Sequence, residues 1–358
     1  MEGALPQTWP NAAELLTGST LDGGWKVVEL LPRRPGATGG NFSVGYRVEH
    51  PDGRQGFCKA LDYASALSRP NTPEALHLAT EEYIFERDLH RKCEERRMSR
   101  ILTALDDGQT FVPNCPIGQV DYIIFELAQY DVRRALDVEA DLEATLRLRA
   151  LHNVAAGLRQ LHQAHIAHQD VKPSNVLILR NGLGERSSKL GDLGRATDAG
   201  RPALHDVYAI AGDRQYAPPE QLYGAVPVEF GPRRLACDIY QLGGLTTFMF
   251  TGATMNSLLS AELHPSHSWL AWSGTYSEVL PYVRDAFGRI LEKIRASIGS
   301  AVAGDVTDLI RHLCEPEPTC RGYAVSKIGG GNPYALQKVV SRFDLLARRA
   351  SKGSLVSV

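Results

Sequence analysis

The chain has 358 residues, 43% of them apolar, so it can bury one large core or two smaller ones. Its formal net charge of −2 and its pI of about 6.6 give no basic field of the kind that binds nucleic acid. No apolar run reaches the ~20 residues of a membrane helix, residues 1–7 lack a signal-peptide pattern, and the six scattered cysteines form no C-x-x-C pair. We therefore expect a cytoplasmic protein with free thiols, no membrane span and no nucleic-acid partner.

The N-terminal part of the chain reads as strands separated by turn residues. Residues 1–22 are polar and interrupted by Pro and Gly, and a short helix over Asn11–Leu16 is their one readable element. Runs rich in Val, Leu and aromatic residues then predict strands at Trp25–Leu31, Tyr46–Glu49 and Gly56–Leu61.

A long helix is predicted next, over residues 71–97. Asn71 is a residue type that caps helix N-termini, and Pro73 falls in the first turn, where proline is tolerated. Two further strands follow around a turn rich in Gly and Pro, at Ile101–Leu105 and Asp121–Leu127.

A polar loop then follows an amphipathic helix. Apolar residues recur at helical spacing over Leu142–Ala164, and the chain continues into His168-Gln169-Asp170-Val171-Lys172-Pro173-Ser174-Asn175. Asp192-Leu193-Gly194 lies seventeen residues past Asn175. An acid, a lysine, an amide and a second acid at these spacings suit phosphoryl transfer. That reaction needs a carboxylate to orient a hydroxyl, a cation beside the moving phosphate, and oxygen ligands for Mg²⁺.

These motifs resemble the catalytic loop and the D-F-G motif of eukaryotic-type (Hanks-type) Ser/Thr protein kinases. The resemblance places Asp170 on the catalytic base and Asn175 and Asp192 on the metal ligands, while Lys172 is typical of the Ser/Thr-specific subgroup. Leu193 replaces the usual Phe. A chance match of a polar loop is the alternative interpretation, and the further motifs below, which follow in the family's order, weigh against it.

The resemblance also implies residues that bind the nucleotide. Lys59, flanked by apolar residues on a strand, matches the lysine that binds the α- and β-phosphates, although such a lysine is usually only a solvent-facing charge. Glu82 and Glu86 share one helix face, and we expect Glu86 to pair with Lys59, with Glu82 as the fallback.

Two backbone segments would approach the nucleotide. The glycine-rich loop matches poorly, through Gly39, Gly40, Phe42 and Ser43, and an ordinary hairpin loop is an alternative there. Phe125 would be the gatekeeper, or simply a core residue, and the backbone from Glu126 to Ala128 would meet adenine.

Three more positions resemble structural residues of the family. Tyr216-Ala217-Pro218-Pro219-Glu220 is similar to the A-P-E motif, and Arg321 is similar to the arginine that pairs with its glutamate. Asp238 is similar to the buried aspartate that supports the catalytic loop. We expect these residues to be structural and not catalytic.

The resemblance covers roughly residues 24–345 and implies a bilobal α+β kinase-like fold. We expect an extension at 1–22, a small lobe of antiparallel sheet with one helix at 23–128, a mostly helical large lobe at 129–345, and a tail at 346–358. Residues 254–300 show little pattern and read as an inserted or divergent segment, and a last helix is predicted at about Tyr334–Ala350.

The implied activity is transfer of the γ-phosphoryl group of Mg·ATP to Ser or Thr of a protein substrate, including the protein itself. The implied cofactors are ATP and Mg²⁺, with ATP bound between the lobes. Two alternatives stay open: a small-molecule phosphotransferase of the aminoglycoside or choline kinase kind, and a pseudokinase that acts as a scaffold.

Gln169 stands where many kinases have an arginine that is neutralised by a phosphate on the activation loop. A neutral amide has no charge to balance, so we expect activity without loop phosphorylation. Asp213 stands where Ser/Thr kinases usually have Thr, and we expect it to reach Lys172.

Overall fold

The computed structural model describes residues 10–32, 43–67, 71–138, 143–180, 186–299, 301–323 and 332–354. The chain divides into two compact units. We call residues 1–97 with 102–128 the sheet unit, and residues 98–101 with 129–358 the helical unit.

The described part of the sheet unit is an antiparallel sheet with a long helix. Its elements are β1 (Lys26–Leu31), β2 (Ser43–Glu49), β3 (Gln55–Leu61), α1 (Ala64–Leu67), α2 (Thr72–Glu95), β4 (Ala104–Phe111) and β5 (Gln119–Glu126). The five strands pair in the order β1-β2-β3-β5-β4. The strands and the long helix predicted from sequence are confirmed, with ends shifted by a few residues.

Strand β4 differs most from its predicted bounds. It runs over Ala104–Phe111, whereas the sequence predicted a strand over Ile101–Leu105. Ile101 instead forms an isolated parallel bridge with Leu190 and belongs to the helical unit.

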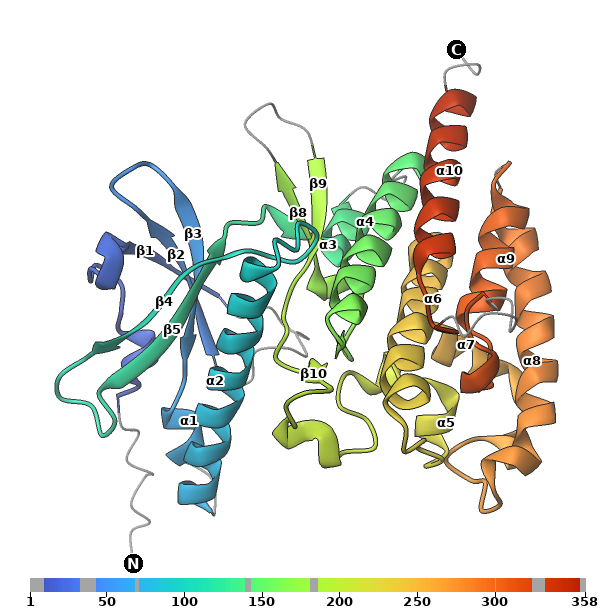
Figure 1. The fold of residues 1–358 in the computed structure, drawn as a ribbon, viewed down its shortest axis with the longest axis horizontal. Helices are drawn as coiled ribbons and strands as arrows, with labels where there is room; N and C mark the ends of the chain where they lie inside the picture. Colours follow the sequence, from blue (N-terminus) through green and yellow to red (C-terminus); the bar gives the residue numbers. More distant parts are fainter. Residues whose placement is uncertain are drawn as a thin grey trace, which may run out of the picture. The chain divides into compact units, whose positions relative to one another are not determined.

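Helix α2 covers one face of the sheet (Figure 1). Side chains alternate between the two faces along a strand, so Lys59 points to the opposite face from its buried neighbours Cys58 and Ala60. Tyr83 of α2 donates a hydrogen bond to the backbone oxygen of Tyr122 at 3.1 Å. The helix is thereby fixed on the face that carries Lys59.

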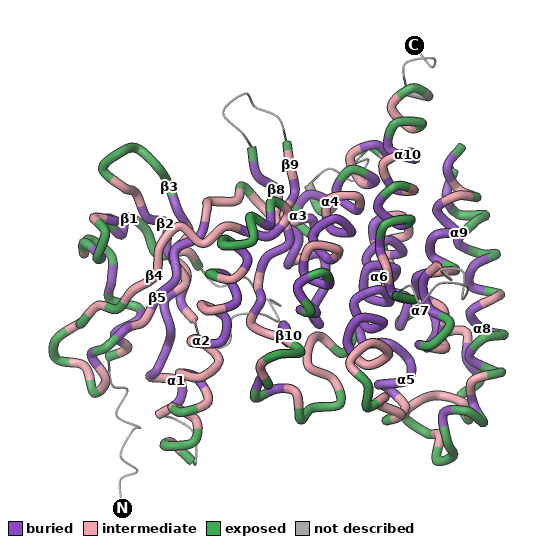
Figure 2. The backbone as a smooth tube through the Cα atoms, viewed as in Figure 1, coloured by how far each residue is buried: buried purple, intermediate pink, exposed green. Residues whose placement is uncertain are grey.

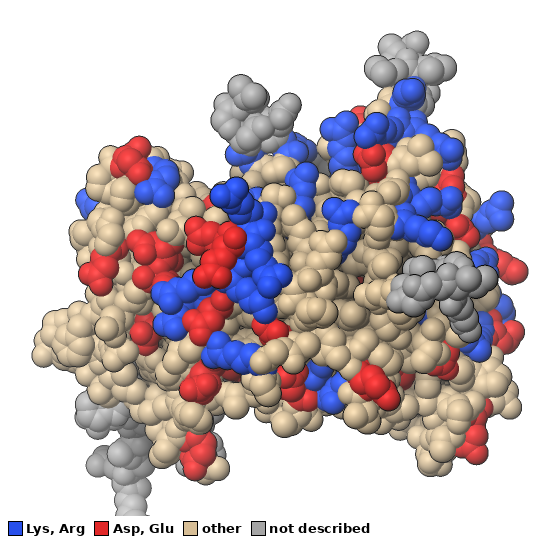
Figure 3. All heavy atoms as spheres, viewed as in Figure 1, with Lys and Arg blue, Asp and Glu red and all other residues tan. Residues whose placement is uncertain are grey.

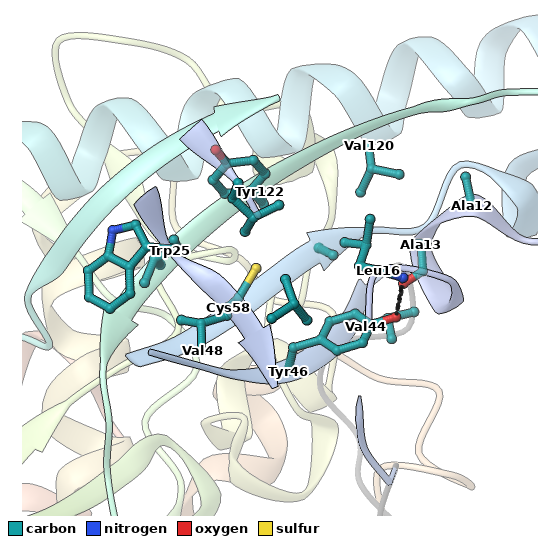
Figure 4. Close-up of a cluster of buried hydrophobic side chains, with 14 residues drawn as sticks. Ala12, Ala13, Leu16, Trp25, Val44, Tyr46, Val48, Cys58, Val120 and Tyr122 are labelled. Carbon is teal, nitrogen blue, oxygen red and sulfur yellow. Dashed lines mark hydrogen bonds between the residues drawn. The ribbon is translucent and has the colours of Figure 1, made fainter. Parts of the chain in front are cut away.

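Residues 10–22 cover the other face, a role that the sequence did not indicate. Ala13 and Leu16 are each 1% exposed and pack in the core with Tyr46 and Tyr122 (Figure 4). The Tyr46 hydroxyl donates to the backbone oxygen of Ala13 at 2.6 Å. Burial raises the pKa of Tyr46 to about 12, so the hydroxyl remains a donor at neutral pH. The segment is therefore part of the core of the sheet unit.

The helical unit contains the following elements within its described residues. They are β6 (Tyr130–Asp131), α3 (Val132–Val138), α4 (Ala144–Gln163), β7 (Ile166–Ala167), β8 (Val176–Arg180), β9 (Arg186–Leu190), β10 (Thr197–Asp198), α5 (Pro219–Leu222), α6 (Ala236–Thr251), α7 (Met255–Glu262), α8 (Tyr276–Ser297), α9 (Ala303–Leu313) and α10 (Gln337–Ser354). Short 3-10 turns include η3 (Pro173–Asn175), η4 (Leu204–Val207) and η5 (Arg214–Tyr216), and a π-helical turn, η6 (Gly231–Leu235), precedes α6.

Helix α6 is the centre of this unit. It stays buried along nearly its whole length, whereas α8 and α10 alternate between buried and exposed residues (Figure 2). Most of its residues are apolar, and buried residues occur on all its faces, as expected for a helix that neighbours surround. The one acid on its first turn, Asp238, is fully buried.

Helix α10 packs along α4 (Figure 1). Its Phe343 is fully buried, and the backbone oxygen of Val340 lies 3.1 Å from Nδ1 of His152 on α4. The last helix predicted from sequence is confirmed, and it supports the helix that leads into the loop at residue 168.

Within residues 254–299 the chain forms two regular helices, α7 and α8, and this part is more patterned than the sequence suggested. Helix α8 begins with a capping box in which Thr275 and Glu278 bond reciprocally, and its buried residues recur every three or four positions.

Charges of both signs are mixed on the face drawn in Figure 3. Arg91 pairs with Asp107 in the sheet unit, and Arg289 pairs with Glu262 in the helical unit. Within the described ranges, no helix combines the length and apolar character that a membrane crossing requires.

Replacing Leu16 by Ala should test whether residues 10–22 belong to the core. We expect the free energy of unfolding to fall by about 2–5 kcal/mol, because the side chain is 1% exposed and its loss leaves a cavity. Leu15→Ala is the matched control, since Leu15 is 53% exposed and its truncation should cost no more than about 0.5 kcal/mol. Urea denaturation of the full chain measures both, and equal values would show that the segment is not core.

Candidate active site

The loop between β7 and β8 is held in place by the carboxylate of Asp238. This side chain is fully buried and accepts backbone hydrogen bonds from His168 at 2.8 Å and Gln169 at 2.7 Å. It also accepts one from Nε2 of the Gln169 side chain, at 3.1 Å, and Nε2 of His162 on α4 lies 2.8 Å away. A buried carboxylate is stable only with such partners, so the loop is fixed by them.

Gln169 has a left-handed backbone conformation, with φ of 65°. Its backbone oxygen accepts from the side-chain amide of Gln241 on α6 at 2.8 Å, and the amide oxygen of Gln241 accepts from the backbone of Val171 at 2.9 Å. These contacts hold a conformation that non-glycine residues rarely adopt, and such outliers concentrate at functional sites.

Asp170 is 5% exposed and is surrounded by three donors. Its Oδ2 accepts from the side-chain amide of Asn175 at 3.0 Å and lies 2.8 Å from Nζ of Lys172. Its Oδ1 accepts from the backbone N–H of Asp213 at 2.8 Å. The structure therefore brings Asp170, Lys172 and Asn175 together around one carboxylate.

Asp213 contacts this group through its side chain as well, since its Oδ2 lies 3.7 Å from Nζ of Lys172. The contact expected between these two residues is thus present. Gly212 allows the approach, because a Cβ there would lie 2.1 Å from the backbone oxygen of Gln169.

Asn175 and Asp192 are joined through Gly191, whose backbone N–H donates to the backbone oxygen of Asn175 at 2.9 Å. His168 accepts from the backbone of Asp170 at Nδ1, at 3.3 Å. Its Nε2 must then carry the proton and donate to the backbone oxygen of Gly191, 3.0 Å away. Asp192 itself has a φ of 59°.

The donor atoms of Asn175 and Asp192 fit Mg²⁺. The amide nitrogen of Asn175 donates to the backbone oxygen of Asp170 at 2.8 Å, so the amide oxygen, which accepts from the Ser174 hydroxyl at 3.4 Å, is the atom that could meet a metal ion. Mg²⁺ takes one or two protein oxygens and completes its shell with water and phosphate. The described residues contain no cluster of three or more His, Cys, Asp or Glu that could hold a metal ion.

In the sheet unit, Lys59 Nζ donates to both carboxylate oxygens of Glu86 at 2.8 Å. The side chain of Glu86 is only 8% exposed and that of Lys59 is 23% exposed. The structure thus joins Lys59 to Glu86, the first choice between the two candidate glutamates.

Some of the other residues expected to contact the nucleotide lie within the described residues. Phe125 is buried and meets the ring of His90 edge-on, with centroids 4.8 Å apart. The backbone N–H of Glu126 donates to Thr103 at 3.1 Å, and Ala128 follows the end of β5, half-buried.

Ser43 begins β2, opposite Leu61 of β3. Gly39, Gly40 and Phe42 lie outside the described residues.

The sequence matches the protein kinase domain family over residues 39–325, which is more than half of the chain. The chain belongs to the protein kinase family. The recognition from the motifs and the bilobal α+β fold class are confirmed.

Curated relatives of this chain are serine/threonine-protein kinases, matched over short stretches. Rat DCLK1 is 33% identical over 102 residues, which are 28% of this chain and 21% of that protein. Human DCLK2 is 34% identical over 102 residues, 28% of this chain and 12% of that protein. PknA of Corynebacterium glutamicum is 33% identical over 117 residues, 33% of this chain and 23% of that protein. The chain therefore matches less than a quarter of the length of each.

Residues 192–220 correspond to the activation segment of the family, and we use that name for them. The end of this segment is held by a buried ion pair. NH1 and NH2 of Arg321 donate to the two carboxylate oxygens of Glu220, each at 2.8 Å. Burial acts to lower the pKa of Arg321, but the charge of Glu220 outweighs it and the pKa lies above its ordinary value. The pairing expected from the motifs is present.

The sequence missed several residues that support this site. His162 and Gln241 lie on helices, and nothing in the neighbouring sequence except their polarity marks them. Each contacts the loop or its supporting acid only because folding brings distant parts of the chain together. Arg234 and Asp206 were also unassigned, although Arg234 contacts the side chain of Gln169.

Replacing Arg321 by Gln should lower the free energy of unfolding by about 3–5 kcal/mol, because Glu220 would remain buried without its counter-ion. The control is Arg284→Gln, which breaks the exposed pair with Glu315 and should cost at most about 1 kcal/mol. Chemical denaturation of both variants decides the matter, and similar losses would mean that the buried pair does not anchor the segment.

Proposed function

We propose that this protein is a serine/threonine protein kinase that transfers the γ-phosphoryl group of Mg·ATP to a hydroxyl of a protein, itself included. The observation that carries the proposal is the convergence of Lys172 and Asn175 on the buried carboxylate of Asp170. Positioning and electrostatics supply most of the catalysis in this reaction, and both need such a fixed group.

Each residue has a proposed task. Asp170 accepts the hydrogen bond of the attacking hydroxyl and orients it, and Lys172 neutralises charge that develops on the phosphoryl group. Asn175 and Asp192 would hold Mg²⁺, which neutralises the phosphate charge when bound.

The sheet unit would contribute the nucleotide contacts. Lys59, held by Glu86, would bind the α- and β-phosphates, and the backbone of Gly39, Gly40, Phe42 and Ser43 would cover them. Because the N–H of Glu126 already donates within the sheet, we propose that it offers its carbonyl to adenine, with Ala128 beside it.

The small-molecule phosphotransferase is less well supported, since Lys172-Pro173 and the Glu220–Arg321 pair are the parts that suggest a protein kinase. We propose a cytoplasmic location, because all six cysteines are free thiols.

Asp170→Asn should lower phosphoryl transfer by at least about a hundredfold while Mg·ATP still binds, because Asp170 meets the acceptor and not the nucleotide. The measurement is mass spectrometry of phosphoserine and phosphothreonine on the protein and on added dephosphorylated casein. The control is Asp344→Asn, which changes a half-exposed acid paired with Arg348 and should match wild type.

Full activity in Asp170→Asn would refute the role of this residue. A wild-type protein that binds ATP without transfer would be a pseudokinase, and one that phosphorylates only small molecules would belong to the other alternative.

Asp192→Asn should weaken Mg·ATP binding as well as turnover, because a neutral amide is a poorer Mg²⁺ ligand than a carboxylate. A thermal-shift titration measures it, since ligand at a hundred times Kd stabilises a folded protein by about 2.7 kcal/mol. Equal stabilisation of mutant and wild type by Mg·ATP would show that Asp192 is not the metal ligand.

A further inference from the structure

Asp206, in the middle of the activation segment, is anchored to the framework of the helical unit. Its Oδ1 accepts from NH2 of Arg234 at 2.8 Å, and its Oδ2 accepts from the backbone N–H of Ala203 at 2.7 Å. NH2 of Arg233 also donates to the backbone oxygen of Asp206, at 2.6 Å. Both arginines belong to η6, the turn that leads into α6.

Arg234 connects this contact to the catalytic loop. Its side chain is 4% exposed, and NH1 donates to the side-chain oxygen of Gln169 at 3.2 Å. The backbone oxygen of Arg234 accepts from the side-chain nitrogen of Gln169 at 2.8 Å. The two ends of the Gln169 amide are thus both held by one residue, and Gln169 directly precedes Asp170.

These contacts correct one premise of the sequence argument. The neutral Gln169 was expected to leave this place without a positive charge. The structure instead puts the positively charged Arg234 against the Gln169 side chain. Burial and the neighbouring Arg233 lower the pKa of Arg234, and the charge of Asp206 opposes that shift. An arginine stays protonated under such conditions, so a buried cation needs an anion here. The chain provides it as Asp206.

The hydroxyl groups of the segment do not offer a comparable anion. Residues 192–220 are all described, and they contain Thr197, Tyr208 and Tyr216 as their only hydroxyl side chains. Thr197 is 1% exposed and Tyr216 is 2% exposed, so a modifying enzyme would not reach them in this fold. Tyr208 is exposed, and NH2 of Arg233 donates to its backbone oxygen, at 3.4 Å, and not to its hydroxyl.

We propose that Asp206 is a positioning residue for phosphoryl transfer. Through Arg234 and Gln169, it holds the catalytic loop in its working conformation with a carboxylate of the chain itself in place of a loop phosphate. The proposal rests on the kinase function proposed above. It also explains how Gln169 keeps its left-handed backbone conformation, because Asp238 and Arg234 hold its side-chain amide.

The test compares Asp206→Asn, Asp206→Glu and the control Asp308→Asn in the full chain. Asp308 is a half-exposed acid that pairs with Arg342, far from the segment in sequence. The assays measure kcat and the KM for Mg·ATP with dephosphorylated casein as acceptor, after phosphatase treatment of every enzyme. We expect kcat of Asp206→Asn to fall by about ten- to hundredfold with little change in the KM for Mg·ATP, because a misplaced catalytic loop slows the transfer step.

The conservative variant separates positioning from a general loss of stability. Asp206→Glu keeps the carboxylate and should recover most of the wild-type kcat, and Asp308→Asn should match wild type. A double variant that adds Arg234→Gln should be no slower than the slower single variant, because both changes break one chain of contacts. If kcat of Asp206→Asn stays within about twofold of wild type, or if Asp206→Glu fails to recover it, the proposal is wrong.

A second readout does not depend on kinase activity. Limited trypsin digestion reports how often the segment opens, since Arg195 and Arg214 lie within it. We expect faster cleavage there in Asp206→Asn, and wild-type cleavage rates in Asp206→Glu and Asp308→Asn. If wild type transfers no phosphate, the proposed function fails, while this digestion still decides whether Asp206 anchors the segment. If Asp206→Asn and wild type are cleaved at equal rates, Asp206 does not anchor the segment.

Discussion

The buried carboxylate of Asp238 is the constraint on which the candidate active site depends. With no solvent contact, its charge is tolerated only because the backbone of residues 168 and 169, the Gln169 side chain and His162 all point at it. A movement of the loop would leave that charge without partners, at a cost of several kcal/mol. The loop that carries Asp170 is therefore rigid, which is what catalysis by positioning requires.

Two ion pairs bind the activation segment to the same framework, and they differ in exposure. The Glu220–Arg321 pair is almost completely buried and satisfies further groups, since Arg321 also donates to the backbone oxygens of Glu315 and Ala236. The Asp206 side chain is 29% exposed, so its pair with Arg234 is partly solvated. The first pair belongs to the permanent fold, whereas the second lies where the segment meets solvent and is the one suited to influence activity.

The sequence predicted what local patterns encode and missed what the fold assembles. The catalytic loop and Asp192 were found because their spacing along the chain is short and chemically specific, and Lys59 was found because its strand matches the family's order of motifs. The contact of Gln169 with Arg234 joins residues 65 positions apart and leaves no local signal. Helix α8 does carry a local signal, since its apolar residues recur every three or four positions, although the segment was predicted to be divergent. Residues 10–22 look like a polar extension because only a few small and branched side chains enter the core.

Native-state hydrogen exchange of the Gln169 amide tests most directly whether Asp238 fixes the loop. The amide donates to a fully buried carboxylate, so the account predicts exchange only through global unfolding, with an opening free energy equal to that of the whole helical unit. The Gly200 amide, which donates to the Asp198 carboxylate in an exposed turn at 2.9 Å, should exchange through local opening and serves as the internal comparison. If the Gln169 amide exchanges as fast as that of Gly200, the loop opens on its own and Asp238 does not determine the geometry of the site.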